Sequence, residues 1–482
     1  MRTKMTALLA TVALLAGCGD GGGGSGGVAT TPTGAATPTP TATAAAGCSL
    51  RARQDWAAAQ IREWYLFPDT LPASLDPSPY TTVDAYIDAL TATARAQRKD
   101  RYFTYLTSIK GEDAYYDSGA SGGFGFRLGI DAANRRVFIA ESFEGTPALA
   151  AGIDRGTEII AIGTSASDLR TTSAIIAAEG PGGVTKALGD DSSGLTRLLR
   201  ISVAGVTRDV TLAKADYTLT PVSSRYGAQI INDGGRQVGY INLRTFISTA
   251  DPALREAFAR FRAAGITNVI VDLRYNGGGL ISIAELFSDL LGGARSTSDV
   301  VDYVSFRPEK ASNNTTRTFQ PQPQSIAPTK IAFIGTGGTA SASELVINTQ
   351  VPFLQANAAL VGTNTYGKPV GQIALDNAAC DDRLRLIALA IQNADRQGAY
   401  YDGLAAFVKS TCQAGDDLTY QLGDPREAST RAALNFLAGQ PCTRITASNG
   451  DASAQSVSSR TKLELLTPDR PDTAQRETPG LF

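Results

Sequence analysis

The chain has 482 residues, of which 43% are hydrophobic and 19% charged, and its net charge is −2. This length allows two or three domains, and the near-neutral charge gives no electrostatic reason to expect a nucleic-acid partner. The chain contains no histidine, which excludes a Ser-His-Asp triad, a Cys-His dyad and an HExxH zinc site. The five cysteines form no CxxC pair, so we predict no metal site.

The N-terminus predicts a secreted, lipid-anchored protein. Residues 1–17 begin with basic residues and continue as an apolar run too short to span a bilayer, which is typical of a signal peptide. The run ends in Leu-Ala-Gly-Cys, which resembles the lipobox of bacterial lipoproteins and places the lipid on Cys18. Residues 18–47 would then be the lipidated cysteine and a low-complexity linker. An ordinary secretory signal is the alternative.

By this resemblance the chain is anchored to a membrane of the cell envelope and faces the periplasm. Sorting to the outer membrane is favoured, because Gly19 and not aspartate follows the cysteine. Four cysteines remain for this oxidising compartment, and they allow three pairings. We expect the bonds Cys380–Cys412 and Cys48–Cys442, with free buried thiols as the alternative.

Residues 48–107 predict a small helical domain. Apolar residues recur at three- and four-residue spacing in 55–61 and 83–90, and prolines separate these two stretches. The region ends in an aromatic cluster, 100–106, which is either part of a core or a docking surface.

Residues 108–220 predict a β-rich domain with strands at 125–130, 136–140, 158–162 and 199–203 and a short helix at 147–151. The stretch 142–160 resembles the PDZ domains of bacterial proteases. The loop Gly123, Phe124, Gly125, Phe126 resembles the carboxylate-binding loop of such domains. Its glycines would expose successive amides to an anion, and the adjacent strand edge would accept an extended peptide. A strand start with a bulge is the alternative.

Residues 221–445 predict an α/β domain. Strands at 238–243, 269–273 and 331–334 alternate with helices at 252–264 and 280–291, which favours parallel pairing with crossovers. The polar, proline-rich residues 446–482 are either a partly disordered tail or a strand that packs back on the protein.

Three stretches of the α/β domain could carry chemistry. Residues 272–280 end a strand in three glycines, whose amides could hold an oxyanion. Residues 335–346, GTGGTASASELV, place two serines at a strand-to-helix turn. Residues 362–368 fit the start of a P-loop, but Pro369 stands where a Ser or Thr should bind Mg²⁺. We therefore do not expect nucleotide binding.

In this order the three stretches resemble the C-terminal-processing, or tail-specific, family of serine proteases. The resemblance implies a multidomain α/β fold with a crotonase-like peptidase core and no cofactor. It implies that Ser341 is the nucleophile, Lys368 the base and Gln372 the residue that orients the lysine. It also implies that the amides of Gly278 and Ala342 form the oxyanion hole.

The chemistry of a lysine base agrees with the local sequence. A lysine acts as a base only when neutral, so its pKa must fall from about 10.4 to about 7–8. No acidic residue occurs between 361 and 373, and a glutamine can accept a hydrogen bond from the amine without stabilising its charge. The alternatives are that Ser341 only caps a helix with Glu344, that Lys368 is solvated, and that the glycines only form a tight turn.

Two features depart from the family pattern. Pro369 replaces a glycine beside the lysine, and the segment 379–417 has no counterpart that the pattern explains. This segment either lines a substrate channel or closes a disulfide loop. The sequence thus predicts a serine endopeptidase that acts on protein or peptide substrates captured by a PDZ-like domain. A catalytically weak or inactive peptide-binding lipoprotein is the alternative, and the oligomeric state is not predicted.

Overall fold

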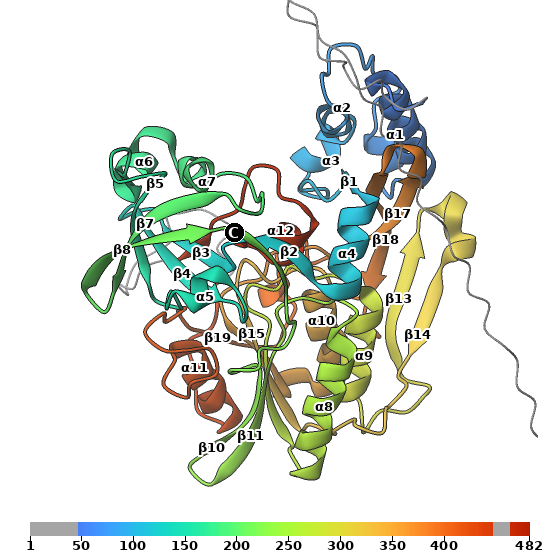
Figure 1. Ribbon diagram of the computed structural model, residues 1–482. Helices are drawn as coiled ribbons and strands as arrows, with labels where there is room; N and C mark the ends of the chain where they lie inside the picture. The colour runs from blue at the N-terminus through green and yellow to red at the C-terminus, as the bar shows by residue number, and fades with distance from the viewer. Residues whose placement is uncertain (1–46, 447–462) are drawn as a thin grey trace, which may run out of the picture. The chain divides into compact units, whose positions relative to one another are not determined.

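Four β-sheets organise the residues that the computed structural model describes, which are 47–446 and 463–482 (Figure 1). These sheets lie in one compact unit, residues 45–482. The predicted signal peptide, Cys18 and nearly all of the predicted linker lie outside the described residues. Within the described ranges, no helix is both long and apolar enough to cross a membrane.

The predicted α/β domain is built on a six-stranded sheet with the order β10-β11-β12-β15-β16-β19. Its strands are β10 (Ala228–Asp233), β11 (Arg236–Asn242), β12 (Asn268–Asp272), β15 (Lys330–Gly335), β16 (Ala358–Gly362) and β19 (Ser410–Gln413). The first pair is antiparallel and every later pair is parallel. The predicted parallel pairing of this domain is therefore confirmed.

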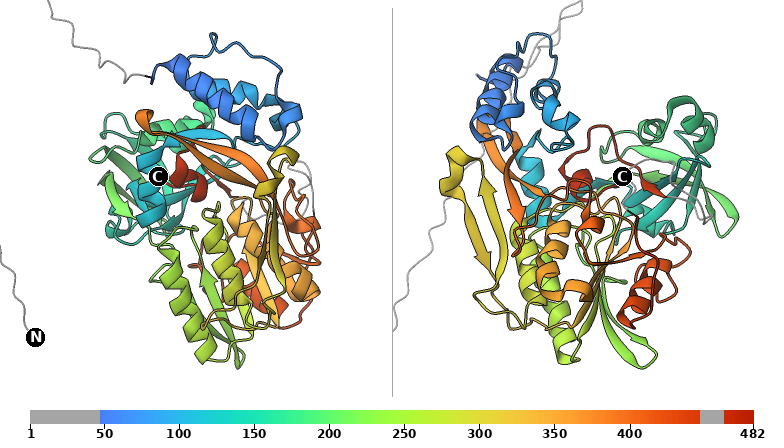
Figure 2. Two further views of the ribbon diagram at one scale, coloured as in Figure 1. Left: turned by 90° about the vertical axis from the view of Figure 1, so that its right-hand side faces the viewer. Right: turned by 180° about the vertical axis from the view of Figure 1, so that it is seen from behind.

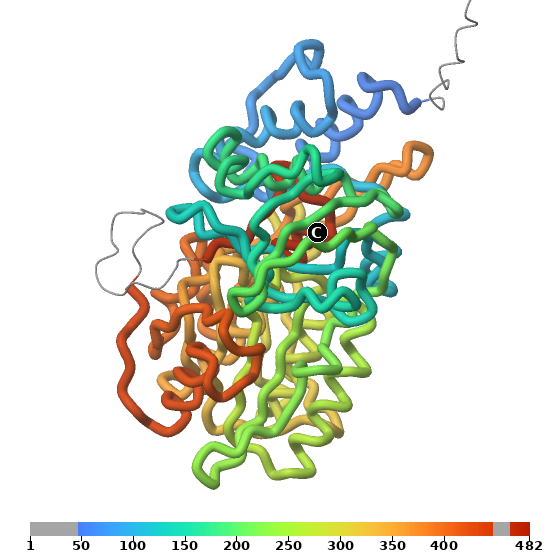
Figure 3. The backbone as a smooth tube through the Cα atoms, turned by 60° about the vertical axis from the view of Figure 1, so that its left-hand side comes forward, coloured from blue at the N-terminus to red at the C-terminus, as the bar shows by residue number. Residues whose placement is uncertain are grey.

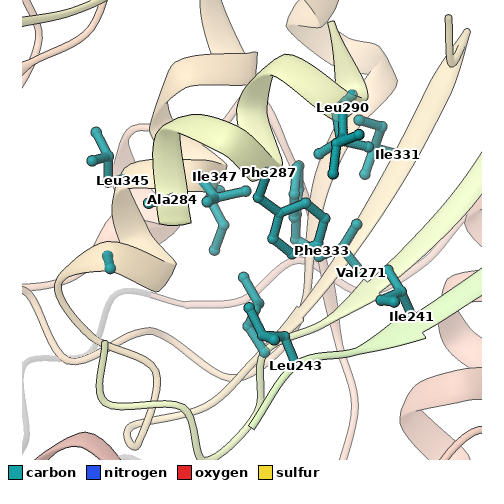
Figure 4. Packing of buried hydrophobic residues seen from close by; sticks show 14 of the residues in the cluster. Ile241, Leu243, Val271, Ala284, Phe287, Leu290, Ile331, Phe333, Leu345 and Ile347 are labelled. Carbon is teal, nitrogen blue, oxygen red and sulfur yellow. The ribbon is translucent and has the colours of Figure 1, made fainter. Parts of the chain in front are cut away.

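Helices cover both faces of this sheet, because alternate strand residues point to opposite faces and both sets are apolar. One face carries α8 (Ala250–Ala263), α9 (Ile281–Leu291) and α10 (Ala342–Leu354), and the other carries α11 (Ala428–Leu437) (Figure 1). Figure 4 shows Phe287 and Leu290 of α9 beside Val271 and Phe333 of adjacent strands. This packing fixes the C-terminal ends of β12 and β15, from which the candidate catalytic turns emerge.

The predicted β-rich domain contains a seven-stranded sheet with the order β20-β3-β4-β5-β7-β8, and β6 pairs with β5. Its strands are β3 (Phe126–Asp131), β4 (Arg136–Ser142), β5 (Glu158–Gly163), β6 (Arg170–Thr171), β7 (Thr196–Val203), β8 (Val206–Ala213) and β20 (Glu464–Leu465). Its helices are α5 (Pro147–Ala150), α6 (Thr172–Glu179) and α7 (Gly182–Leu188). A two-stranded ribbon of β2 (Ala120–Gly123) and β9 (Ala215–Thr218) follows α4 (Ile109–Ser118).

The predicted helical region packs on a five-stranded sheet. Helices α1 (Leu50–Trp64), α2 (Val83–Leu90) and α3 (Ala92–Ala96) share an apolar cluster with Leu384 and Leu386, and in Figure 2 they lie beside β17 and β18. The strands of this sheet are β1 (Tyr105–Ser108), β13 (Val300–Phe306), β14 (Thr315–Thr318), β17 (Val370–Asn377) and β18 (Asp382–Gln392). The helical prediction is wrong at its end, because residues 105–108 pair as β1 with β18, a partner far along the chain.

Both disulfides differ from the predicted pairing. Cys48 is bonded to Cys380 and Cys412 to Cys442, with Cα–Cα distances of 5.5 and 5.3 Å. Cys48 precedes α1, which packs on the β17–β18 hairpin whose turn carries Cys380. Cys412 belongs to β19, in a different sheet. The predicted bonds Cys380–Cys412 and Cys48–Cys442 are therefore wrong, because each would join a cysteine beside the β17–β18 hairpin to one beside β19.

The C-terminal residues 463–482 pack back on the protein. They form β20, which pairs with β3, and the short helix α12 (Thr473–Glu477). Figure 3 shows the last residues running between segments of the β3–β8 sheet and the rest of the chain. Residues 463–482 therefore agree with the second of the two alternatives for the tail, a segment that packs back on the protein.

The disulfide assignment predicts a stability difference. In a non-reducing digest, the peptide of Cys48 should be joined to that of Cys380. The variant Cys48→Ser/Cys380→Ser should lower the free energy of unfolding by about 2–4 kcal/mol in urea titrations, because this bond spans 332 residues of the unfolded chain.

The matched control is Cys412→Ser/Cys442→Ser, whose bond spans 30 residues and should contribute less. A peptide that joins Cys380 to Cys412 would contradict the assignment.

Candidate active site

Ser341 lies between β15 and α10, at the N-terminal end of the helix. Its φ of +54° is uncommon for a residue with a side chain and indicates local backbone strain. The Ser341 amide donates to Oε2 of Glu344 at 3.1 Å, and Thr339 Oγ1 donates to the carbonyl of Leu273 at 2.8 Å. Hydrogen bonds therefore fix the turn on both sides of Ser341, so the direction of its side chain is fixed as well.

The glycine turn after β12 lies directly against Ser341. A Cβ atom on Gly278, whose φ is +126°, would come within 2.8 Å of the Ser341 Cβ, so only glycine fits there. The amide of Gly278 donates to Oδ1 of Asn276 at 2.9 Å. For the next amide, that of Gly279, no hydrogen bond is found among the described residues. Gly279 lines the same cavity as Ser341 and Ala342.

Lys368 lies in the turn between β16 and β17. Its Nζ donates to Oε1 of Gln372 at 2.8 Å. The Nε2 of Gln372 donates to the carbonyl of Phe103, whose ring centre is 5.1 Å from the lysine Nζ. The aromatic cluster at 100–106 therefore contacts both Lys368 and Gln372 through Phe103. A strand and not a helix follows Lys368, so the P-loop-like stretch lacks the geometry of a P-loop.

The same cluster holds the lysine turn through main-chain contacts. Arg101 Nη2 donates to the carbonyl oxygens of Tyr366 and Gly367, and its guanidinium lies 4.1 Å from the ring centre of Tyr366. Asp100 fixes the cluster itself by accepting the amide of Phe103 at 2.8 Å. The N-terminal helical region thus contributes directly to the position of Lys368.

The surroundings of Lys368 lower its pKa below the ordinary value. Burial is the main cause, since it disfavours the charged amine, and Arg476 and Arg385 add to the effect. Glu477 and Asp100 oppose it. The neutral amine is therefore available at a lower pH than in an exposed lysine.

Glu344 connects the serine turn to the lysine turn. Its carboxylate accepts the amides of Gly367 and Lys368, both at 2.7 Å, in addition to the amide of Ser341. It also accepts the hydroxyl of Thr365 at 2.6 Å. Burial raises the pKa of Glu344, and these hydrogen bonds oppose that rise. The residue caps α10, as its capping-box position suggests, but it also joins two segments that are separate in sequence.

The candidate catalytic residues line one cavity of about 210 Å³, to which Ser341, Lys368 and Gln372 all contribute. Its apolar wall contains Leu280, Ile281, Leu345, Ile391 and Tyr400. Tyr400 belongs to the segment 379–417, so this segment contributes to the cavity and closes no disulfide loop. Glu477 from the C-terminal segment also lines the cavity.

The predicted peptide-binding loop is not part of this cavity. The side chains of Phe124 and Phe126 are buried in the core of the β3–β8 sheet. The amides of Gly125 and Phe126 both donate to the main-chain oxygen of Phe482, at 2.9 and 3.2 Å. Gly123 also lies against this residue, because a Cβ atom on Gly123 would come within 2.6 Å of the Phe482 carbonyl carbon.

Several residues of the site were not identified from the sequence. They are Phe103, Arg101, Asn276 and Glu477, and the second role of Glu344. Phe103, Arg101 and Glu477 contact the catalytic stretches from segments that are distant in sequence, so no local pattern indicates them. Asn276 lies within the glycine stretch itself, two residues from Gly278, and Glu344 lies within the serine stretch. Among the described residues, no group of three or more metal-ligating side chains is found.

Known peptidases match part of this chain in sequence. Residues 237–395 match the model of Peptidase family S41. The chain is 28% identical over 260 residues to a carboxyl-terminal-processing protease of Synechocystis, which covers 52% of this chain and 54% of that protein. It is 35% identical over 153 residues to carboxyl-terminal-processing peptidase 1 of Arabidopsis thaliana, which covers 31% of this chain and 28% of that protein. The match thus spans about half or less of these relatives.

A solved structure shares the fold. The putative S41 protease of Bacteroides fragilis aligns with a TM-score of 0.62 at 23% identity, over 80% of this chain and 97% of that one. The predicted multidomain α/β fold is therefore confirmed. The chain is therefore similar to peptidase family S41 over residues 237–395 and to the carboxyl-terminal-processing proteases over about half of its length.

Proposed function

We propose that the chain is a serine endopeptidase in which Ser341 is the nucleophile, Lys368 the general base and Gln372 the residue that orients the lysine. The observation that carries this proposal is the 2.8 Å contact between Lys368 Nζ and Gln372 Oε1, in a cavity that Ser341 also lines. In a chain without histidine, a lysine with a lowered pKa is the base that this cavity provides.

In the first step, Ser341 Oγ attacks the carbonyl carbon of the scissile peptide bond while neutral Lys368 takes its proton. The tetrahedral intermediate then collapses, the C–N bond breaks, and the lysine ammonium returns the proton to the leaving amine. An acyl-enzyme ester on Ser341 remains. Lys368, neutral again, removes a proton from water, which attacks the ester carbonyl. The C–O bond to Ser341 then breaks, the lysine ammonium returns the proton to Ser341 Oγ, and the acyl product leaves as a carboxylic acid.

The developing oxyanion would be held by main-chain amides. One is the amide of Ala342, next to the nucleophile. The sequence assigns the second to Gly278, whose amide must first give up its bond to Asn276. The neighbouring Gly279 amide carries no such bond and is the simpler donor. The apolar wall of the cavity favours uncharged side chains beside the scissile bond.

Other parts of the chain would serve this reaction. We assign residues 108–220 as a PDZ-like domain that captures extended protein segments at the loop 123–126, which is supported by the two amides of that loop that bind one oxygen atom. Residues 1–17 and Cys18 would act as a lipoprotein signal and anchor the enzyme in the cell envelope, facing the periplasm. Residues 48–107, 221–445 and 446–482 would be the helical domain, the peptidase core and the tail.

The first prediction separates catalysis from folding. Ser341→Ala and Lys368→Ala should each lower kcat/KM for an unfolded protein substrate by about four orders of magnitude, because each removes a group that acts in bond cleavage. Thermal unfolding should change little in either variant. A serine-reactive acylating probe should label the wild type and fail to label Ser341→Ala.

The matched control is Ser343→Ala, because Ser343 donates to the carbonyl of Asn276 and does not line the cavity. This variant should keep its probe labelling. Retained cleavage in Ser341→Ala would contradict the proposal, and labelling without cleavage would favour the peptide-binding alternative.

The second prediction concerns pH. In the wild type, kcat/KM should rise with pH as Lys368 loses its proton, with a midpoint below the ordinary pKa of lysine. Gln372→Glu should move this limb upward by about one to three pH units, because a carboxylate beside the amine stabilises its charged form.

The uncharged control is Gln372→Met, which removes the hydrogen bond without adding a negative charge. This variant should lower kcat/KM, and the midpoint of its pH dependence should not move to higher pH. A limb that stays in place or moves downward in Gln372→Glu would show that Lys368 does not supply the titrating base.

A further inference from the structure

The C-terminal segment occupies the loop that we assign to substrate capture. Besides the two amides that bind the Phe482 oxygen, the Phe482 amide donates to the carbonyl of Phe126 at 3.0 Å. Two residues earlier, the carbonyl of Gly480 accepts the amide of Leu128 at 2.8 Å. Residues 480–482 thus add to the edge of β3 as an extended peptide would.

The side chains of this segment are also accommodated. Phe482 is 2% exposed and belongs to the same apolar cluster as Phe124, Phe126 and Leu188. Leu481 points into a second cluster with Tyr115 and other aromatic residues. The groove therefore receives one large apolar side chain at the position whose oxygen is held by the loop amides.

The same segment contacts the catalytic turn. The carbonyl of Glu477 accepts the amide of Gly277 at 2.9 Å, next to the glycine that touches Ser341. A Cβ atom on Gly277 would come within 2.1 Å of the Arg476 carbonyl oxygen, so the two main chains are in close contact. The Glu477 side chain lines the cavity and accepts the hydroxyl of Tyr116 at 3.0 Å.

One buried arginine connects the two contacts. Arg127, on β3, donates from Nη1 to the carbonyl of Pro479 in the tail and to that of Tyr275 in the catalytic turn, the latter at 2.8 Å. Its Nε donates to Glu141 at 3.2 Å. Occupation of the groove and the arrangement of the catalytic turn therefore share a contact.

We propose that residues 473–482 are an internal ligand of this enzyme, which fills the peptide groove along β3 and narrows the catalytic cavity until a protein segment with a large apolar residue at the position of Phe482 displaces it. This inference rests on the proposed function, and it adds the chemistry of the partner that the groove selects. That partner presents an extended main chain to Leu128 and Phe126 and an aromatic or aliphatic side chain in place of that of Phe482.

The contacts explain why such an exchange is possible. Main-chain groups make the bonds between residues 480–482 and β3, so another extended peptide can make the same bonds whatever its sequence. Selectivity then comes from the side chain at the position of Phe482, because a charged side chain there would be buried among apolar residues. Displacement would remove Glu477 from the cavity wall and free the amide of Gly277.

The test combines binding with cleavage. A fluorescent peptide with the sequence of residues 478–482, Thr-Pro-Gly-Leu-Phe, is titrated into the wild type and into Phe482→Asp, in which the tail no longer fits the groove. The variant should bind the peptide at least tenfold more tightly. It should also cleave an internally quenched peptide with blocked ends several-fold faster, and adding Thr-Pro-Gly-Leu-Phe should accelerate the wild type.

The controls are Arg470→Ala and a peptide ending in Asp. Arg470 forms a surface ion pair with Asp88, so its variant should behave as the wild type does. The Asp-ending peptide should neither bind nor activate.

Equal peptide binding by the wild type and a folded Phe482→Asp would overturn the proposal, and so would a wild type that saturating peptide does not accelerate. The wild-type experiment decides the matter if Phe482→Asp fails to fold. Absence of cleavage by every variant would instead contradict the proposed function, and the binding ratio would still decide whether the tail occupies the groove.

Discussion

The candidate active site depends on one buried carboxylate, that of Glu344. A carboxylate away from water is unfavourable unless hydrogen bonds replace its hydration, and here three main-chain amides and one hydroxyl do so. Those amides belong to Ser341, Gly367 and Lys368. Satisfying the carboxylate therefore requires the serine turn and the lysine turn to lie side by side, so the energetic requirement of one residue fixes the position of two others.

The placement of negative charge around Lys368 follows a related constraint. Glu344 bonds to the main chain of the lysine turn, while the amine itself contacts the uncharged amide of Gln372. A carboxylate can thus organise the turn without being the partner of the amine. Burial then lowers the pKa of Lys368, and the negative charge of Glu477 is the main influence that opposes this decrease. Glu477 belongs to the tail, which is also the segment that we propose a peptide displaces.

What the sequence predicts correctly is what short-range patterns encode. The parallel strands and covering helices of the α/β domain follow from the spacing of apolar residues. The stretches with Ser341 and Lys368 are linked in the sequence only by the family resemblance, and in the structure they line one cavity. The errors concern contacts between distant segments. Cys48 pairs with Cys380 because α1 packs on the β17–β18 hairpin, and Phe103 reaches Gln372 across more than half of the chain. The spacing of apolar residues along the sequence does not indicate either of these long-range contacts.

The tail contacts both the peptide groove and the catalytic turn, so it can couple these two sites. Coupling between two sites needs an element with two arrangements that both sites influence. In our proposal the tail is this element, because it bonds to the peptide groove through Phe482 and to the catalytic turn through Glu477. Arg127 strengthens the connection, since it bonds both partners while its charge is compensated by Glu141. A peptide that replaces Phe482 must therefore disturb the contacts beside Ser341, because the four residues between Glu477 and Phe482 are too few to leave the two positions independent.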